Sequence, residues 1–360
     1  MEKMVLTQEQ AHRAASELFE LMTPLGVLQC LHTVASLGVA DVLGSRTMNA
    51  EEISKELPGK VRPEALQRCL RLLASKGLLI ETKAGDGVGV GCFAYSLTST
   101  TALLQTGVPD QPSFAPIVMH NLEKPSWGAW GEVSNYVAGV IDESPFKAYN
   151  GDDVFDFYAR TPVSEDYFHE AMKMFSSVEL PFILESGGWG ELSGKRVVDC
   201  GGSKGAVMGA VKAKFPEVTC TTFDLPEIIA KAGLPPEGVT FAPGDIFNAS
   251  TIPEADVFFM KMFVHDFDDQ DATKILKNCH ARLPVGGQVL LAEAVLPDPG
   301  EAAPGRPRQQ VIYMDMHMMT IHGRQRTRAQ FVALAEAAGL RLIKFQEGPK
   351  LCFVTMEKKA

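Results

Sequence analysis

The sequence lacks the residue patterns of disulfide-linked and metal-binding proteins. Its seven cysteines are scattered along the 360 residues without a C-x-x-C pair, and its eight histidines include no H-x-x-x-H pair. These absences argue against a disulfide framework and against the common zinc motifs. We therefore expect free thiols in a reducing compartment and no bound metal.

Long apolar runs and excess positive charge are also missing. No stretch of about 18 apolar residues occurs, so no membrane partner is expected. The first ten residues do not show the basic segment and apolar core of a secretory signal. The chain carries 34 Lys and Arg against 44 Asp and Glu, a net charge of −10, which disfavours binding to nucleic acid. The expected location is the cytoplasm, with an organelle as the alternative.

Residues 1–105 predict a winged-helix domain. Helix starts are indicated by Thr23 before Pro24, by Asn49 with Glu52 three residues later, and by Pro63. Two apolar segments then flank a glycine-rich turn and predict a β-hairpin; they are residues 78–82 and 92–98. Three helices followed by a hairpin form a winged helix.

A winged helix can bind DNA or mediate dimerisation, and the charges favour dimerisation. The third helix offers only Arg68, Arg71 and Lys76, which are few for a surface that follows a phosphate backbone. The first two helices are strongly apolar and can pair with a second copy of the chain. We expect a homodimer with no nucleic acid partner.

The remainder of the chain divides into two regions. Residues 106–190 are predicted to be helical, and their many aromatic rings indicate the wall of a pocket for a small-molecule acceptor, with core packing as the alternative. Residues 191–360 alternate short apolar strands with helices, which predicts an α/β domain with a parallel sheet covered on both faces. Such sheets bind ligands at the carboxyl ends of their strands.

The first strand of the α/β region leads into the turn "VVDCGGSKG", which indicates a nucleoside site. Gly201, Gly202 and Gly205 allow the backbone to turn tightly and approach a ligand. Asp224 and Asp245 close the next two strands, and an acid after the second strand can bind both ribose hydroxyls. Glycines and acids at successive strand ends together predict a nucleoside ligand.

The charge next to the glycine turn narrows the choice of ligand. Asp199 precedes the first glycine by two residues and would repel a pyrophosphate, and the G-x-G-x-x-G motif of dinucleotide sites is absent. The acid suits a positively charged ligand. S-adenosylmethionine (SAM) has an ammonium, a sulfonium and no phosphate.

Five segments in order carry a family resemblance: "VVDCGGSKG", "FDLPEII", "GDIF", "KMFVHDFDDQDATKILKNC" and "LLAEAVLP". Together they resemble the small-molecule O-methyltransferases of the plant caffeate and animal acetylserotonin type, over nearly the whole chain. The resemblance implies an α/β, Rossmann-like SAM methyltransferase domain preceded by a mostly α winged-helix dimerisation domain. It also implies which residues hold SAM: Gly201, Asp224, Asp245, Ile246 and Lys261.

The resemblance assigns catalysis to His265 and Glu293. His265 would be the general base, since an ordinary histidine accepts a proton near neutral pH. Glu293 would orient it, as carboxylates commonly do for catalytic histidines. The implied acceptor-binding residues are Phe168, Met172, Phe175 and Met318, for which core packing is the alternative interpretation.

Two positions depart from the family pattern. Ser203 replaces a glycine of the cofactor turn, and Gln325 replaces an acid that helps to orient the histidine in the plant enzymes. Glutamine accepts a hydrogen bond but cannot stabilise a protonated imidazole by charge.

Four functions therefore stay open. O-methylation of a hydroxylated acceptor is favoured. The alternative is S-methylation of a small thioether acid, such as 4-methylthio-2-hydroxybutyrate in dimethylsulfoniopropionate biosynthesis, which needs no base. N-methylation is a lesser option, and a winged-helix regulator that senses SAM is a remote one.

Overall fold

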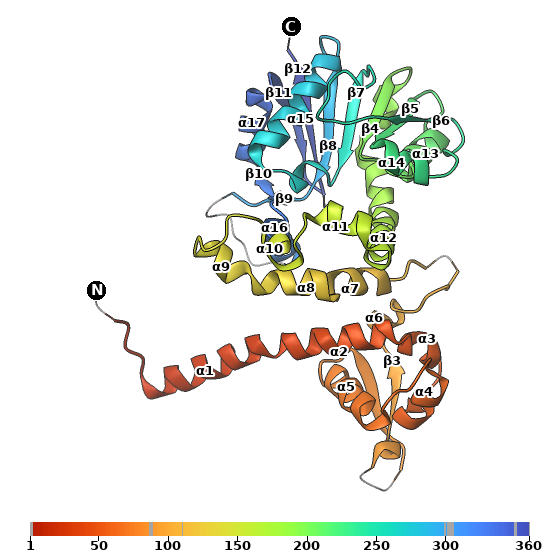
Figure 1. Cartoon of the computed structure of the whole chain (residues 1–360), viewed down its shortest axis with the longest axis vertical. Helices are drawn as coiled ribbons and strands as arrows, with labels where there is room; N and C mark the ends of the chain where they lie inside the picture. The colour runs from red at the N-terminus through yellow and green to blue at the C-terminus, as the bar shows by residue number, and fades with distance from the viewer. Residues whose placement is uncertain are drawn as a thin grey trace. The chain divides into compact units, whose positions relative to one another are not determined.

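The computed structural model describes residues 3–85, 89–109, 111–298, 300, 306–348 and 351–359, with the side chains of 306–308 excepted. By its internal contacts the chain forms two compact units (Figure 1). Unit 1 comprises Met1–Trp127 and Tyr158–Met174, and unit 2 comprises Gly128–Phe157 and Phe175–Ala360. The expected division at residues 105 and 190 stays a prediction.

Unit 1 contains the expected helices and hairpin. Its N-terminal helices are α1 (Gln8–Met22), α2 (Pro24–Ser36), α3 (Val39–Leu43), α4 (Ala50–Glu56) and α5 (Pro63–Ser75). The Asn49 side chain accepts from the N–H groups of Glu51 and Glu52, which confirms the capping box at the start of α4. Strands β2 (Leu79–Lys83) and β3 (Phe93–Leu97) pair antiparallel as predicted. Residues 86–88 of the predicted turn lie outside the described residues.

A third strand, β1 (Met48–Asn49), was not predicted. It pairs with the far edge of β3, so the sheet order is β1-β3-β2. Two residues are too few to show an alternating pattern in the sequence. The wing is therefore a three-stranded sheet.

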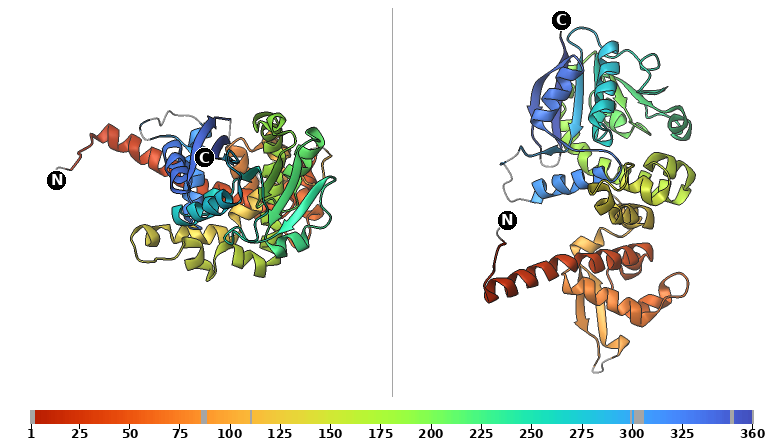
Figure 2. Two further views of the ribbon diagram at one scale, coloured as in Figure 1. Left: turned by 90° about the horizontal axis from the view of Figure 1, so that it is seen from above. Right: turned by 60° about the vertical axis from the view of Figure 1, so that its left-hand side comes forward.

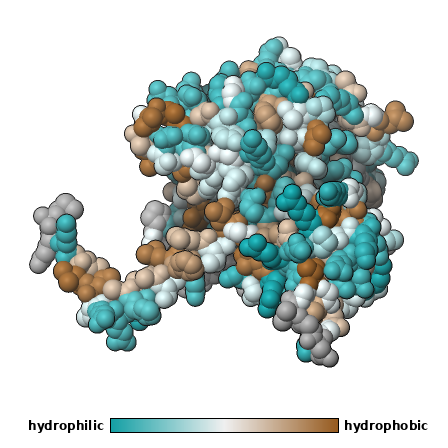
Figure 3. Space-filling view, turned by 60° about the horizontal axis from the view of Figure 1, so that its bottom comes forward, coloured by the Kyte–Doolittle hydropathy of each residue, from teal (hydrophilic) through white to brown (hydrophobic). Residues whose placement is uncertain are grey.

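The core of unit 1 lies between α2–α5 and this sheet. It includes the fully buried Val34, Leu43, Ile53, Leu70 and Tyr95. Helix α1 contributes no buried residue. Its apolar side chains stay on the surface, as Figure 3 shows along the N-terminal helix. Unit 1 continues with α6 (Ser99–Ala102) and α7 (Ala115–Leu122), while α8 (Lys124–Gly131), α11 (Val154–Arg160) and α12 (Pro162–Ser186) each run from one unit into the other.

Unit 2 is built on a seven-stranded sheet with the order β11-β12-β8-β7-β4-β5-β6. The strands are β4 (Arg196–Cys200), β5 (Thr219–Asp224), β6 (Val239–Pro243), β7 (Val257–Lys261), β8 (Gln288–Glu293), β11 (Leu340–Gln346) and β12 (Cys352–Lys358). The first five are parallel, as predicted, but β12 runs antiparallel to β8 and β11 antiparallel to β12. The expectation of a parallel sheet was wrong at this edge, because only five residues separate β11 from β12 in the sequence, too few for a crossover helix.

Helices cover both faces of the large sheet, as predicted (Figures 1 and 2). One buried cluster joins the sheet to α15 (Asp269–Arg282) and α17 (Arg328–Ala337), and includes Ile275 and Phe331. The other joins the opposite face to α13 (Ala206–Lys214) and Trp189. The sheet is therefore buried on both sides, and its carboxyl edge stays available for a ligand.

The remaining elements of the two units are short or lie beyond the ends of the strands of the large sheet. They are α9 (Val133–Val137), α10 (Pro145–Asn150), α14 (Pro226–Lys231), α16 (Arg306–Met319), the small parallel pair β9 (Val295–Leu296) and β10 (Arg326–Thr327), and the 3-10 turns Val90–Cys92 in unit 1 and Trp189–Leu192 and Val264–Asp266 in unit 2. The β9–β10 pair brings the segment after α16 beside the segment after β8.

Candidate active site at the carboxyl edge of the sheet

The carboxyl ends of four parallel strands bring the predicted cofactor and catalytic residues to one edge of unit 2. Gly201 follows β4, Asp224 ends β5, Lys261 ends β7 and Glu293 ends β8. His265 lies four residues beyond Lys261. This edge is where α/β sheets bind ligands.

The glycine turn after β4 has no room for side chains at its first two positions. Gly201 has a φ of +75°, and a Cβ there would lie 2.5 Å from the Phe263 ring. A Cβ on Gly202 would lie 2.5 Å from Oδ2 of Asp199. The backbone is therefore close to its neighbours and needs both glycines.

Ser203 adopts the left-handed conformation without being glycine, with a φ of +50°. Such a conformation costs free energy in a residue with a side chain. The Ser203 N–H donates to Asp224 Oδ2 at 2.8 Å, and the Leu225 N–H donates to Asp224 Oδ1 at 2.8 Å. Asp224 thus ties the glycine turn to the end of β5.

Asp199 places a carboxyl group beneath this turn. It is only 3% exposed, and burial raises its pKa to about 8, with Lys261 opposing the shift and Asp224 adding to it. The Lys261 ammonium is engaged elsewhere, since its Nζ lies 3.1 Å from Glu179 Oε2. A buried acid with a raised pKa suits a cationic ligand, because a positive charge would offset the cost of ionisation.

Asp245 and Ile246, the residues predicted to hold the adenine, follow β6 in a loop. Asp245 is exposed and its Oδ1 accepts from the Phe247 N–H at 2.8 Å. Ile246 is buried, and its carbonyl accepts from Nδ2 of Asn278 at 2.8 Å. The loop therefore offers one fixed carboxylate and one apolar side chain.

His265 lies in the short turn Val264–Asp266 directly after β7. It is 7% exposed, its Nδ1 is 2.7 Å from Gln325 Nε2, and its Nε2 is 3.4 Å from Asp266 Oδ1. Burial, together with the nearby charges of Lys261, His317 and Arg326, lowers its pKa to about 3, against a backbone hydrogen bond to Met262. The imidazole is therefore neutral at physiological pH.

Gln325 determines which ring nitrogen of His265 carries the proton. As placed, the amide nitrogen faces Nδ1, while the amide oxygen is buried without a partner among the described residues. Rotating the amide by 180° exchanges its oxygen and nitrogen with little other change. The oxygen would then accept from Nδ1–H and leave the lone pair on Nε2. A general base at Nε2 needs this second arrangement.

Glu293 binds backbone instead of the imidazole. It is fully buried, and its Oε1 accepts from the N–H groups of Phe263 at 3.0 Å and Val264 at 2.8 Å. Burial raises the Glu293 pKa to about 7, against these two hydrogen bonds. Any influence on His265 acts through the turn, and the catalytic assignment of Glu293 stays a prediction.

Sequence reasoning missed Arg326, which is 1% exposed. Its guanidinium donates to Asp269 Oδ1 at 2.9 Å, to the Val264 carbonyl at 3.0 Å and to the Phe267 carbonyl at 2.9 Å. The available signal in the sequence was the acidic start of α15, which offers carboxylates that an arginine can bind. Asp268 caps α15, whereas Asp269 pairs with Arg326.

The predicted acceptor residues are distributed over both units. Phe168 and Met172 belong to unit 1, whereas Phe175 and the buried Met318 belong to unit 2. Phe168 stacks on Tyr158 with ring centroids 5.1 Å apart. The acceptor role of all four stays a prediction.

Each unit contains a polar side chain close to aromatic rings: Glu123 in unit 1 and His317 in unit 2. In unit 1, Glu123 is 8% exposed; Ser164 donates to its Oε2 at 2.8 Å, and its Oε1 has no partner within the described ranges. In unit 2, Trp130 stacks on Tyr313 at 5.7 Å and on His317 at 6.3 Å.

The described residues contain no group of three or more His, Cys, Asp or Glu that could hold a metal ion. The expectation that the protein binds no metal stays a prediction.

Comparison with known proteins agrees with the geometry of this site. Residues 130–341 match the family model for an O-methyltransferase domain, and residues 19–107 match that for an O-methyltransferase dimerisation domain. Flavone O-methyltransferase 1 of Triticum aestivum is 32% identical over 323 residues, covering 87% of each chain. Nicotinate N-methyltransferase 1 of Glycine max is 34% identical over 351 residues, covering 94% of each chain.

A solved structure shows the same fold. Human N-acetylserotonin methyltransferase in complex with SAM superposes with a TM-score of 0.81 at 22% identity, covering 99% of this chain and 100% of that one.

Proposed function

Because the chain belongs to the O-methyltransferase family and is a SAM-dependent methyltransferase, we propose that it methylates a phenolic hydroxyl of a small acceptor, with His265 as general base. The observation that carries this proposal is a neutral, buried imidazole at the strand edge that also carries the glycine turn. Because the family model and the relatives are methyltransferases, the chain is an enzyme, and the interpretation as a SAM-sensing regulator is set aside. S-methylation of a thioether is not favoured, since the family model and the flavone relative are O-methyltransferases.

The residues of the glycine turn fit SAM. When bound, SAM supplies a methyl group on a positively charged sulfur. Asp199 would face a cationic part of it, Asp224 would accept from the ribose, and Asp245 with Ile246 would hold the adenine. Gly201 and Gly202 keep the turn close to Phe263 and Asp199, because a Cβ at either position would collide with one of these side chains.

His265 would accept the hydroxyl proton at Nε2 while the acceptor oxygen forms its bond to the methyl carbon and the carbon–sulfur bond breaks. A base is most effective when its pKa lies near the working pH, and the pKa of His265 is about 3. Such a weak base suits an acidic hydroxyl. This favours a phenol over an aliphatic alcohol.

Methylation of a ring nitrogen is a second candidate. A pyridine nitrogen has a lone pair and no proton to lose, so a site with Gln325 in place of an acid would suffice. The soybean relative is a nicotinate N-methyltransferase. His265 would then position the acceptor without taking a proton.

One experiment separates these candidates. S-adenosylhomocysteine production would be measured with a panel of phenols and with nicotinate, for the wild type and for His265→Asn and His265→Ala. The proposal expects turnover of a phenol that falls at least about 100-fold in both variants, as loss of a general base does. Turnover of nicotinate alone, largely kept in the His265 variants, would replace O-methylation by N-methylation.

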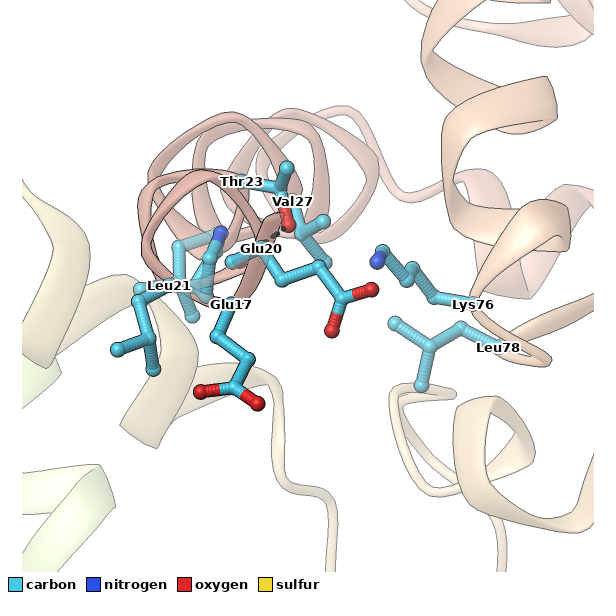
Figure 4. A pocket seen from close by; sticks show the side chains of 9 residues that line it. Glu17, Glu20, Leu21, Thr23, Val27, Lys76 and Leu78 are labelled. Carbon is cyan, nitrogen blue, oxygen red and sulfur yellow. Dashed lines mark hydrogen bonds between the residues drawn. The ribbon is translucent and has the colours of Figure 1, made fainter. Parts of the chain in front are cut away.

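We also propose that unit 1 forms a homodimer through α1 and α2. The dimerisation model covers residues 19–107, and several large apolar side chains of α1 and α2 are more than half exposed: Leu18, Phe19, Leu21, Met22 and Leu25. A groove of about 620 Å³ adjoins them, with Glu20 and Leu21 on one side and Lys76 and Leu78 on the other (Figure 4). A second copy would cover this surface.

The same surface gives the helical run Gln8–Ser36 the length and composition of a membrane span. A dimer interface accounts for this apolar character without a membrane. Size measurement by light scattering tests it: Leu21→Glu should produce monomers, while Leu234→Glu, at a 93% exposed leucine of unit 2, should leave the dimer intact. A monomeric wild type would refute the proposal.

A cytoplasmic location is part of the proposal. All seven cysteines are free, which agrees with a reducing compartment. Fluorescence microscopy of a tagged full chain would test it.

A further inference from the structure

The turn that carries His265 is held by two buried side chains of opposite charge. Glu293 Oε1 accepts from the N–H groups of Phe263 and Val264. Arg326 donates to the carbonyls of Val264 and Phe267. Side chains from other segments thus bind four backbone groups around His265, three before it in the sequence and one after it.

The turn needs such support because its backbone is irregular. Met262, at the end of β7, has a φ of +46°, which is strained for a residue with a side chain. The 3-10 turn that follows is only three residues long, and turns of this kind are weak on their own. Its conformation must be imposed by the surrounding structure.

We propose that Arg326 is a positioning residue for methyl transfer, and that with Glu293 it forms a charge clamp that fixes the turn and the electrostatic surroundings of His265. The kinetic part of this inference rests on the proposed function. The clamp itself consists of the hydrogen bonds described above. Arg326 does not touch the reacting atoms and acts through the turn.

The geometry requires arginine. The guanidinium donates in three directions at 2.9–3.0 Å, whereas a lysine ammonium on its flexible stem is a single point charge and cannot reproduce this planar fork. Arg326→Lys is therefore expected to keep the charge and lose much of the positioning.

Arg326 also contributes charge. His265 is faced by Lys261 from β7, His317 from α16 and Arg326 from β10. The acidic groups are Asp266 on the same turn and Glu293 at the end of β8, whose pKa values burial raises, and Asp269 at the start of α15. Asp269 is 57% exposed, so solvent screens its pairing with Arg326. The positive charge of Arg326 therefore acts on the turn and helps to keep His265 neutral.

Arg324 offers a matched control two residues away. Its Nη1 also binds Asp269, at 2.8 Å, and it is 42% exposed. It contacts His265 through its backbone N–H, which donates to the His265 carbonyl at 2.7 Å. Arg324→Gln removes an equal charge near the same acid and keeps this backbone contact.

The test compares Arg326→Gln, Arg326→Lys and Arg324→Gln in the full-length protein. We expect kcat to fall roughly 100-fold in Arg326→Gln, as a displacement of about 1 Å at an active site can cause, and somewhat less in Arg326→Lys. The SAM dissociation constant, measured by calorimetry, should stay within about twofold. Arg324→Gln should change both quantities by less than about twofold.

A second readout does not depend on turnover. In protein labelled with ¹⁵N-histidine, the His265 signals, identified by their loss in His265→Asn, should report a shifted pKa or tautomer in Arg326→Gln and unchanged signals in Arg324→Gln. If the His265 signals are the same in wild type and Arg326→Gln, or if kcat is kept in that variant, the clamp is overturned. If no phenol turns over while the His265 signals move as expected, the clamp stands and the proposed acceptor is wrong.

Discussion

Binding of SAM should release close to one proton from Asp199. The carboxyl is 3% exposed and its pKa is raised to about 8, mainly by burial. By the titration equation, a group with this pKa is about 90% protonated at pH 7. A cation bound beside the glycine turn favours the ionised form and lowers the pKa.

The size of the effect follows from the change in the pKa of Asp199. If the bound cation lowers this pKa from about 8 to about 6, roughly 0.8 proton leaves at pH 7, and each tenfold change in the acid dissociation constant corresponds to about 1.4 kcal/mol of coupling. The folded, ligand-free protein holds the proton and the complex does not. SAM affinity therefore rises with pH between about 6 and 8, by up to about tenfold for each pH step of one, and levels off above about pH 8.

Isothermal titration calorimetry measures this release directly. Binding enthalpies in phosphate and Tris, whose ionisation heats differ, give the number of protons exchanged at pH 7. The matched variant Asp199→Asn should exchange almost none and bind SAM with little pH dependence. Proton release near zero in the wild type, or equal release in the variant, would refute the assignment of Asp199 as the acid that faces the cation.

Three further perturbations test other parts of the structure. Gln325→Glu puts a carboxylate beside His265 Nδ1, so the pKa of the imidazole should rise and the acid limb of the kcat–pH profile should move to higher pH; an unchanged profile would show that Gln325 does not act on the base. Gly201→Ala adds a Cβ 2.5 Å from the Phe263 ring at a φ of +75°. Calorimetry should therefore detect no SAM binding, and the free energy of unfolding should fall by at least about 1 kcal/mol. Normal SAM binding by this variant would contradict the close approach. Burial raises the pKa of Glu123, so this residue lowers the stability of the folded protein as the pH rises above its unfolded pKa. Glu123→Gln should therefore raise the melting temperature more at pH 8 than at pH 5. An equal change at both pH values would show that Glu123 is not buried as a carboxyl.

Local patterns predicted the elements that the structure confirms. The capping box at Asn49 and the alternation of strands and helices after residue 195 depend on neighbours within a few positions, which the sequence displays directly. The carboxyl-edge placement of Asp224 and Lys261 followed because parallel strands end at a common edge. These features were predictable because their causes are local or topological.

The support around His265 was not predictable in the same way. Arg326 binds the Val264 carbonyl across 62 residues of sequence, and Glu293 binds the Val264 N–H across 29. No short-range pattern encodes a side chain that bonds to distant backbone, since any arginine or glutamate near a strand end looks the same. The antiparallel strand β12 was likewise set by pairing with β8 on one side and β11 on the other, which the sequence does not show.

Burial is the main cause of the low pKa of His265, and the cationic groups around it lower the pKa further. Lys261 and Arg326 disfavour a positive imidazolium, which lowers the pKa of His265. The same charges would stabilise a negative oxygen on an acceptor bound next to the imidazole, which lowers the pKa of its hydroxyl. Proton transfer depends on the difference between the two pKa values, so these charges offset only the part of the His265 shift that they themselves cause. A site of this kind can therefore omit the acid at position 325, provided that the amide of Gln325 presents its oxygen to Nδ1 and leaves Nε2 free to accept the proton.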